Sequence, residues 1–203
     1  AVNSATSALH LTYKALGLKK GDFVWTSPNT FIATANAALY CGAEVDFVDI
    51  DSKTYNISIK KLKDKLKKAD REKKLPKIVT CVHFAGQSCS MEEIFKLSKR
   101  YNFKIVEDAS HAFGAKYKGE YIGNCYYSDV AIFSFHPVKI ITTGEGGVAV
   151  TNNDEIANKI SMLSSHGIVR NNQNNIIKEE IWNYYQSDLG FNYRITDIQA
   201  ALG

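Results

Sequence analysis

A lysine and an aspartate each follow an apolar segment and could therefore act on one ligand. Lys139 comes shortly after the apolar run 129–133 and before the glycine-rich stretch 144–147, whereas Asp108 ends the strand-like run 104–107. In open α/β sheets, ligands bind in the crevice at the carboxyl ends of the parallel strands. We therefore expect the amine and the carboxylate to lie close together there.

This pair of side chains suits the chemistry of pyridoxal phosphate. An amine that is partly removed from water is easily held neutral and nucleophilic, so it can attach to the cofactor's aldehyde. A carboxylate beside the pyridine nitrogen keeps that nitrogen protonated, which lets the ring accept electrons. Lys139 alone could be a surface residue, since the chain has 25 lysines and arginines. Its pairing with Asp108 favours the catalytic interpretation.

Five segments of the chain resemble the DegT/DnrJ family of pyridoxal-phosphate-dependent nucleotide-sugar aminotransferases. They are NSATSAL (3–9), EDASHA (107–112), FSFHPVK (133–139), GEGG (144–147) and GFNYR (190–194). The segments occur in the family's order and extend over the whole chain. The resemblance implies an α/β fold, the large domain of the fold-type I PLP-dependent transferases, with a mainly parallel mixed sheet and helices on both faces.

The resemblance also sets an expectation for domain organisation. Residues 1–203 would form the PLP-binding large domain, and the chain is expected to be a fragment that lacks the family's N-terminal segment and small C-terminal domain. Lys139 would carry the cofactor, and Asp108 would bind its pyridine nitrogen.

Hydroxyl groups near the first helix are the expected phosphate ligands. Thr6 and Ser7 would lie where backbone N–H groups bind a phosphate well. From the residues alone they could be an ordinary helix cap, but the resemblance favours the phosphate. Ser134 is similar to the family's third phosphate hydroxyl.

Three ring-bearing residues are further candidates. The family places an aromatic residue at the position of Phe31, stacked on the pyridine ring; from the residues alone, core packing is the better interpretation. His111 corresponds to a position near the cofactor's ring. His136 could contact the sugar or be a hydrogen-bonded structural histidine.

The resemblance implies a homodimer with shared active sites, in which Asn192 reaches the phosphate of the neighbouring subunit's cofactor. The polar and aromatic segment 170–187 could border the sugar. Arg170 and Lys178 within it are candidates for the nucleotide's pyrophosphate, or solvated loop charges.

The resemblance predicts transfer of an amino group from L-glutamate to C4 of a nucleotide-linked 4-keto-6-deoxy sugar. Segments 3–9, 136–139 and 165–169 are most similar to the family members of pseudaminic acid biosynthesis, which use a UDP-linked sugar. The alternatives are a perosamine- or bacillosamine-type enzyme and a non-catalytic regulatory protein with this fold. A related sugar dehydratase would carry histidine in place of Lys139.

Composition excludes several other classes of protein. No apolar run approaches the roughly 20 residues of a membrane span, and no signal peptide is present, so we expect a cytoplasmic protein. Cys81, His83 and Cys89 match no standard zinc spacing, so we expect no metal. Residues 60–77 hold ten Lys/Arg and three Asp/Glu. Without interleaved aromatic residues, they indicate a solvated helix face rather than a nucleic-acid site.

Alternating elements must position these residues. The hydrophobic pattern predicts a basic amphipathic helix within 60–77 and further helices at 6–16, 31–40, 91–101 and 154–164, the last capped by Asp154. It predicts strands at 23–26, 45–49, 78–84, 104–107, 130–134 and 147–151. Such alternation is typical of a mainly parallel sheet covered by helices on both faces.

Overall fold

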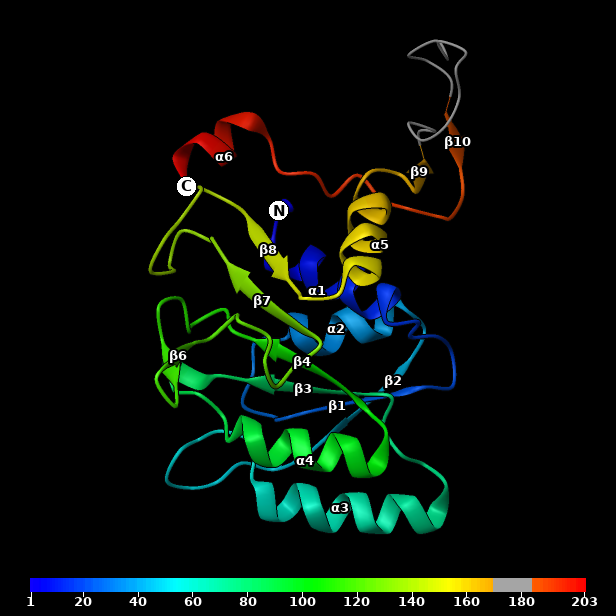
Figure 1. The fold of residues 1–203 in the computed structure, drawn as a ribbon, viewed down its shortest axis with the longest axis vertical. Coiled ribbons are helices and arrows are strands. Elements are labelled where there is room, and N and C mark those ends of the chain that lie inside the picture. The colour runs from blue at the N-terminus through cyan, green and yellow to red at the C-terminus, as the bar shows by residue number, and fades with distance from the viewer. Residues whose placement is uncertain (170–183) are drawn as a thin grey trace.

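One six-stranded sheet organises the chain (Figure 1). The computed structural model describes residues 1–169 and 184–203. In spatial order the strands are β2 (Glu44–Phe47), β1 (Phe23–Thr26), β3 (Ile78–Val82), β4 (Lys104–Asp108), β7 (Val130–Ser134) and β8 (Gly147–Val150). Neighbouring strands are parallel from β2 to β7, and β8 is antiparallel to β7. The predicted mainly parallel mixed sheet is therefore confirmed.

Helices cover both faces of this sheet, as predicted (Figure 1). One face carries α1 (Ala5–Ala15), α2 (Ala33–Tyr40) and α5 (Asp154–Ser164), and the other carries α3 (Ile59–Glu72) and α4 (Met91–Tyr101). The smaller elements are the 3-10 turn η1 (Phe84–Gly86), the hairpin β5 (Lys116–Tyr117) and β6 (Glu120–Tyr121), the pair β9 (Ile168–Val169) and β10 (Tyr185–Gln186), and α6 (Asp197–Leu202).

Strand β4 shows how the two faces differ. Successive side chains of a strand point to opposite faces. Val106 packs with the core residues of α1 and α2, whereas Ile105 packs with those of α3 and α4. By the same alternation Asp108 faces the α1 and α2 side, and Glu107 faces the α3 and α4 side. The predicted catalytic carboxylate is thus assigned to one face by its place in the strand.

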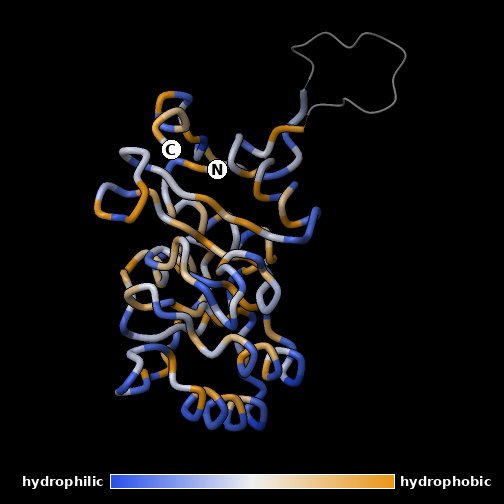
Figure 2. Tube along the Cα trace, turned by 60° about the vertical axis from the view of Figure 1, so that its left-hand side comes forward, coloured by the Kyte–Doolittle hydropathy of each residue, from blue (hydrophilic) through white to orange (hydrophobic). Residues whose placement is uncertain are grey.

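The basic segment forms an amphipathic helix, as predicted. In α3, Leu62, Leu66 and Ala69 are buried against the sheet. The hydrophilic side of this helix lies on the outside of the molecule (Figure 2). Several of its lysines form surface ion pairs, including Lys63 with Glu93 at 2.6 Å. Such a face is solvated and contributes little to stability.

The predicted cap of α5 and the predicted start of α2 differ from the structure. Asn153, not Asp154, caps α5: its side chain accepts a hydrogen bond from the backbone N–H of Ile156 at 3.1 Å. Asp154 instead lies in the first turn, where its negative charge interacts favourably with the positive end of the helix dipole. Helix α2 begins at Ala33 rather than at 31, which leaves Phe31 outside the helix.

Within the described ranges, no helix combines the length and the apolar character needed to cross a membrane. The same residues contain no cluster of three or more potential metal ligands.

Candidate active site

Asp108 is the buried carboxylate of the site. It ends β4 with 5% of its surface exposed. Its Oδ2 accepts a hydrogen bond from the Thr34 hydroxyl at 2.7 Å, and its Oδ1 accepts from the Ser110 hydroxyl at 2.6 Å and the Ser110 backbone N–H at 3.2 Å. A buried carboxylate is costly unless hydrogen bonds satisfy it, and these donors meet that need.

Lys139 lies in the turn that follows β7. Its backbone N–H donates to the carbonyl of His136 at 2.9 Å, which closes the turn, and its side chain is half-buried. Lys139 and Asp108 line the same cavity of about 280 Å³. The structure therefore brings together the amine and the carboxylate that the sequence pairs, although they are 31 positions apart in the chain.

The N-terminus of α1 borders this cavity with hydroxyl groups. Ser4 caps the helix by accepting a hydrogen bond from the Ser7 backbone N–H at 3.1 Å. Ser4, Thr6 and Ser134 line the cavity. The Ser7 hydroxyl instead donates to the Asn3 side chain at 2.6 Å, and Ser7 is not among the residues that line this cavity. A helix N-terminus with nearby hydroxyls is a favourable site for a phosphate.

A glycine lets the sheet approach this helix start. Gly147, at the beginning of β8, exchanges two backbone hydrogen bonds with Val2 at 2.8 and 2.9 Å. A Cβ atom at Gly147 would lie 2.4 Å from the backbone nitrogen of Ala5, so only glycine fits here. The glycine-rich stretch thus positions the N-terminus of α1 beside the cavity.

The donor set of the cavity fits pyridoxal phosphate. Hydroxyls and the helix N-terminus suit its phosphate, the Asp108 carboxylate suits a protonated ring nitrogen, and Lys139 supplies an amine for the aldehyde. The observation behind this fit is that all these groups line one cavity.

Phe31 and His111 line the cavity from two loops. Phe31 is 74% exposed, so the core-packing interpretation is wrong, and the ring is available to a ligand. Partial burial lowers the pKa of His111, and the positive charge of Lys139 lowers it further, while Asp108 opposes the shift. The lowered pKa favours the neutral form of the His111 imidazole.

His136 and Glu145 also line the cavity. The Nε2 atom of His136 is 3.8 Å from a carboxylate oxygen of Glu145, and both side chains are about half exposed, at 48% and 54%. An exposed pair at this distance is weak. It leaves both side chains free to contact a substrate.

Asn192 lies away from the cavity lining. It is exposed, and its backbone forms a bridge with Ser165. The neighbouring residues hold it against α1: the Tyr193 hydroxyl is 3.3 Å from Nδ1 of His10, and the Phe191 ring is centred 4.7 Å from that of His10. Within one subunit, Asn192 is therefore fixed at the surface. Arg170 and Lys178, the proposed pyrophosphate contacts, lie outside the described residues.

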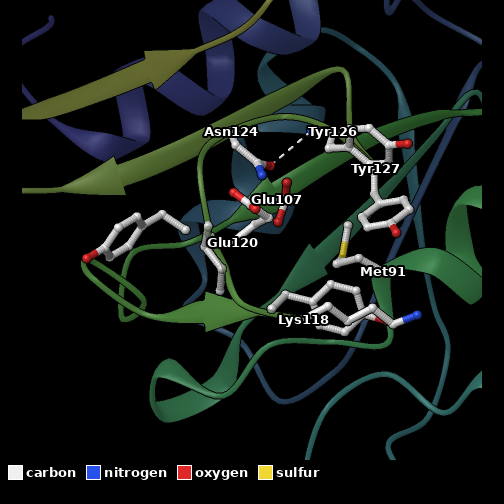
Figure 3. A pocket seen from close by; sticks show the side chains of 10 residues that line it. Met91, Glu107, Lys118, Glu120, Asn124, Tyr126 and Tyr127 are labelled. Carbon is white, nitrogen blue, oxygen red and sulfur yellow. Dashed lines mark hydrogen bonds between the residues drawn. The ribbon is translucent and has the colours of Figure 1, made fainter.

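A second cavity, of about 360 Å³, lies on the opposite face of the sheet (Figure 3). Glu107 points into it among tyrosines of the 117–127 segment. Both oxygens of Glu107 are already bonded: Oε2 to Nε2 of His83 at 2.7 Å, and Oε1 to the Ser128 hydroxyl. Nδ1 of His83 accepts from the Cys89 backbone N–H at 3.1 Å, so this ring donates from Nε2. Glu107 therefore has a structural role: its hydrogen bonds connect β4 to the segments that contain His83 and Ser128.

Two residues that line the first cavity, and one that lies behind it, were not predicted from the sequence. Ser4 carries a local signal, since serine is a favoured helix cap. Ser110 also carries one, because a hydroxyl two residues after an aspartate often bonds to it. Thr34 carries none, since its contact with Asp108 spans 74 positions.

A model of the DegT/DnrJ/EryC1/StrS aminotransferase family matches residues 1–203. One relative, the UDP-4-amino-4,6-dideoxy-N-acetyl-beta-L-altrosamine transaminase of Campylobacter jejuni subsp. jejuni serotype O:23/36, is 48% identical over 202 residues. The match covers 100% of this chain and 50% of that relative, so the chain spans about half the relative's length.

Solved structures share the fold. Helicobacter pylori PseC, an aminotransferase involved in the biosynthesis of pseudoaminic acid, has a TM-score of 0.85 at 32% identity, over 99% of this chain and 50% of that chain. The PLP-form of a putative sugar aminotransferase, Spr1654 from Streptococcus pneumoniae, has a TM-score of 0.81 at 28% identity, over 100% of this chain and 52% of that chain.

Proposed function

Because the chain belongs to the DegT/DnrJ/EryC1/StrS aminotransferase family, we propose that it is the cofactor-binding large domain of a PLP-dependent nucleotide-sugar aminotransferase. Its fold is that of the fold-type I aminotransferases, as predicted. One observation carries the proposal: Lys139 and Asp108 line a single cavity together with the hydroxyl-bearing start of α1. A regulatory protein that merely kept the fold would not need this pair.

Each residue has a role in this proposal. When bound, pyridoxal phosphate supplies an aldehyde for amine transfer and a ring that accepts an electron pair. Ser4, Thr6 and Ser134 hold the phosphate with the N–H groups of α1. Asp108 holds a proton on the ring nitrogen. Lys139 holds the cofactor covalently at rest; once released, its Nζ takes the proton from the α-carbon of the amino donor.

The substrate we propose is a UDP-linked 2-acetamido-2,6-dideoxy-4-keto hexose, aminated at C4 with L-glutamate as donor on the route to pseudaminic acid. The Campylobacter relative, a UDP-4-amino-4,6-dideoxy-N-acetyl-beta-L-altrosamine transaminase that is 48% identical over 202 residues, supports this choice. The residues around Lys139 serve the cofactor and do not distinguish nucleotides.

The predicted cytoplasmic location remains a prediction.

A substrate panel tests this proposal. The complete protein is incubated with L-glutamate and, in turn, with UDP-, dTDP- and GDP-linked 4-keto sugars. We expect the UDP-linked sugar to turn over fastest and to yield a 4-amino product, identified by mass and by NMR of the C4 centre. A strong preference for the GDP-linked sugar would instead indicate a perosamine-type enzyme, and no transamination of any sugar would contradict the aminotransferase proposal.

We further propose that the complete protein is a homodimer in which Asn192 completes the partner's site. Asn192 supports this because it is exposed and outside its own cavity, and because its neighbours Phe191 and Tyr193 pack against His10. In such a dimer, each cofactor site would combine Lys139 of one subunit with Asn192 of the other.

Mixed dimers test the sharing. Subunits with Lys139→Ala are combined with subunits carrying Asn192→Ala, each variant being weakly active or inactive alone. In the mixed dimer one site receives both defects and the other receives neither, so we expect up to half of the wild-type activity per dimer. If confirmed mixed dimers recover no activity beyond that of the parents, the sites are not shared.

A further inference from the structure

Thr34 binds the catalytic carboxylate from behind the cavity. It lies in the first turn of α2, its side chain is completely buried, and its hydroxyl donates to Oδ2 of Asp108 at 2.7 Å. Thr34 is not among the residues that line the cavity. Its hydroxyl can therefore influence a ligand only through its hydrogen-bond partners, Asp108 and Thr30.

A chain of hydroxyls sets the direction of this hydrogen bond. The single proton of the Thr34 hydroxyl is used on the carboxylate, so the Thr30 hydroxyl, 2.8 Å away, must donate to Thr34. Consecutive hydrogen bonds of this kind polarise and strengthen one another. Thr30 lines the cavity, so the relay runs from the cavity wall through the protein to Asp108.

Buried contacts fix Thr34 in place. The Tyr13 hydroxyl lies 3.2 Å from the Thr34 carbonyl and 2.7 Å from the Thr80 hydroxyl, and the Thr26 hydroxyl donates to the Thr80 carbonyl at 3.0 Å. The first turn of α2 is thereby tied to α1 and to strands β1 and β3. These contacts hold the backbone of Thr34 in place, which keeps its hydroxyl within reach of Asp108.

Resting on the proposed function, we propose that Thr34 is a positioning residue that keeps the cofactor's ring nitrogen protonated by holding Asp108 charged and aligned. Hydrogen bonds to a carboxylate favour its charged form. Thr34 donates to one oxygen of Asp108 and Ser110 donates to the other, so hydrogen bonds satisfy the charged carboxylate and set its orientation. The proton stays on the ring, where it supports electron withdrawal from the substrate.

The test follows the ring nitrogen directly. The complete protein is loaded with pyridoxal phosphate labelled with ¹⁵N in the ring, and the ¹⁵N NMR shift is recorded against pH. In the wild type we expect the protonated signal at neutral pH. In Thr34→Val, which keeps the shape and removes the hydroxyl, the shift should move towards the unprotonated value, and kcat should fall roughly tenfold, the effect of one lost hydrogen bond to a charge.

Two variants serve as controls. Thr34→Ser retains the hydroxyl and should restore the wild-type ¹⁵N signal. Thr12→Val alters another fully buried threonine, whose hydroxyl has no partner among the described residues, and should leave both the signal and kcat unchanged. Thr30→Val removes the donor upstream of Thr34 and should cause a smaller shift in the same direction, which keeps the inference testable if Thr34→Val does not fold.

The outcomes separate the inference from the proposed function. If the wild type forms no covalent complex with the cofactor, the proposed function fails and the inference fails with it. If the wild type binds the cofactor and the folded Thr34→Val or Thr30→Val proteins give the wild-type ¹⁵N shift, only the role of Thr34 is overturned.

Discussion

Replacing Lys139 with alanine is expected to abolish amino transfer in the complete enzyme. The variant loses both the group that holds the cofactor and the base that moves the substrate's proton. Loss of a positioned general acid–base alone costs about 10²- to 10⁴-fold in rate. The cofactor should still bind through its phosphate, because Ser4, Thr6 and Ser134 are untouched. Turnover of sugar and release of 2-oxoglutarate measure the loss.

Chemical trapping identifies the lysine independently of activity. Borohydride reduces the bond between cofactor and lysine to a stable one, and peptide mapping then shows which residue carries the cofactor. We expect the label on Lys139 only. Lys104→Ala is a suitable control, since Lys104 is an exposed lysine paired with Asp129 at 2.9 Å, and it should be labelled and active like the wild type. Label on a different lysine would overturn the assignment.

The sequence was sufficient to predict the groups that lie at strand ends. Asp108 and Lys139 follow apolar segments, and the parallel arrangement of β4 and β7 brings their carboxyl ends to one edge of the sheet. For these residues, local pattern and general topology rules are enough.

Contacts that depend on packing could not be predicted in this way. Thr34 reaches Asp108 only because α2 packs beside β4, which no local pattern encodes. Phenylalanine is a residue type usually found in the core. Phe31, however, lies in the turn before α2, which leaves its side chain exposed at the cavity. Asn192 belongs to the same class: its expected ligand lies in another subunit, so its role stays a prediction.

The second large effect is expected at Asp108. In Asp108→Asn the side chain keeps its size and loses its charge, so it no longer favours a proton on the ring nitrogen. Removing one preorganised electrostatic group from an active site typically costs about 10²- to 10³-fold in kcat. We expect a loss of this size, with a smaller change in KM, measured in the complete enzyme with L-glutamate and the keto sugar.

The surroundings of Asp108 make this substitution harsher than the loss of charge alone. Thr34 donates to one carboxylate oxygen and Ser110 to the other. An asparagine presents one oxygen and one NH₂ group, so the hydroxyl that faces the NH₂ group must accept from it, and the proton of that hydroxyl loses its present acceptor. We therefore also expect a lower free energy of unfolding, by about 1–3 kcal/mol for a buried group left unpaired. Thermal unfolding of the variant beside the exposed control Asp49→Asn separates this loss from the loss of chemistry. If folded Asp108→Asn turns over at nearly the wild-type rate, Asp108 does not hold the ring nitrogen.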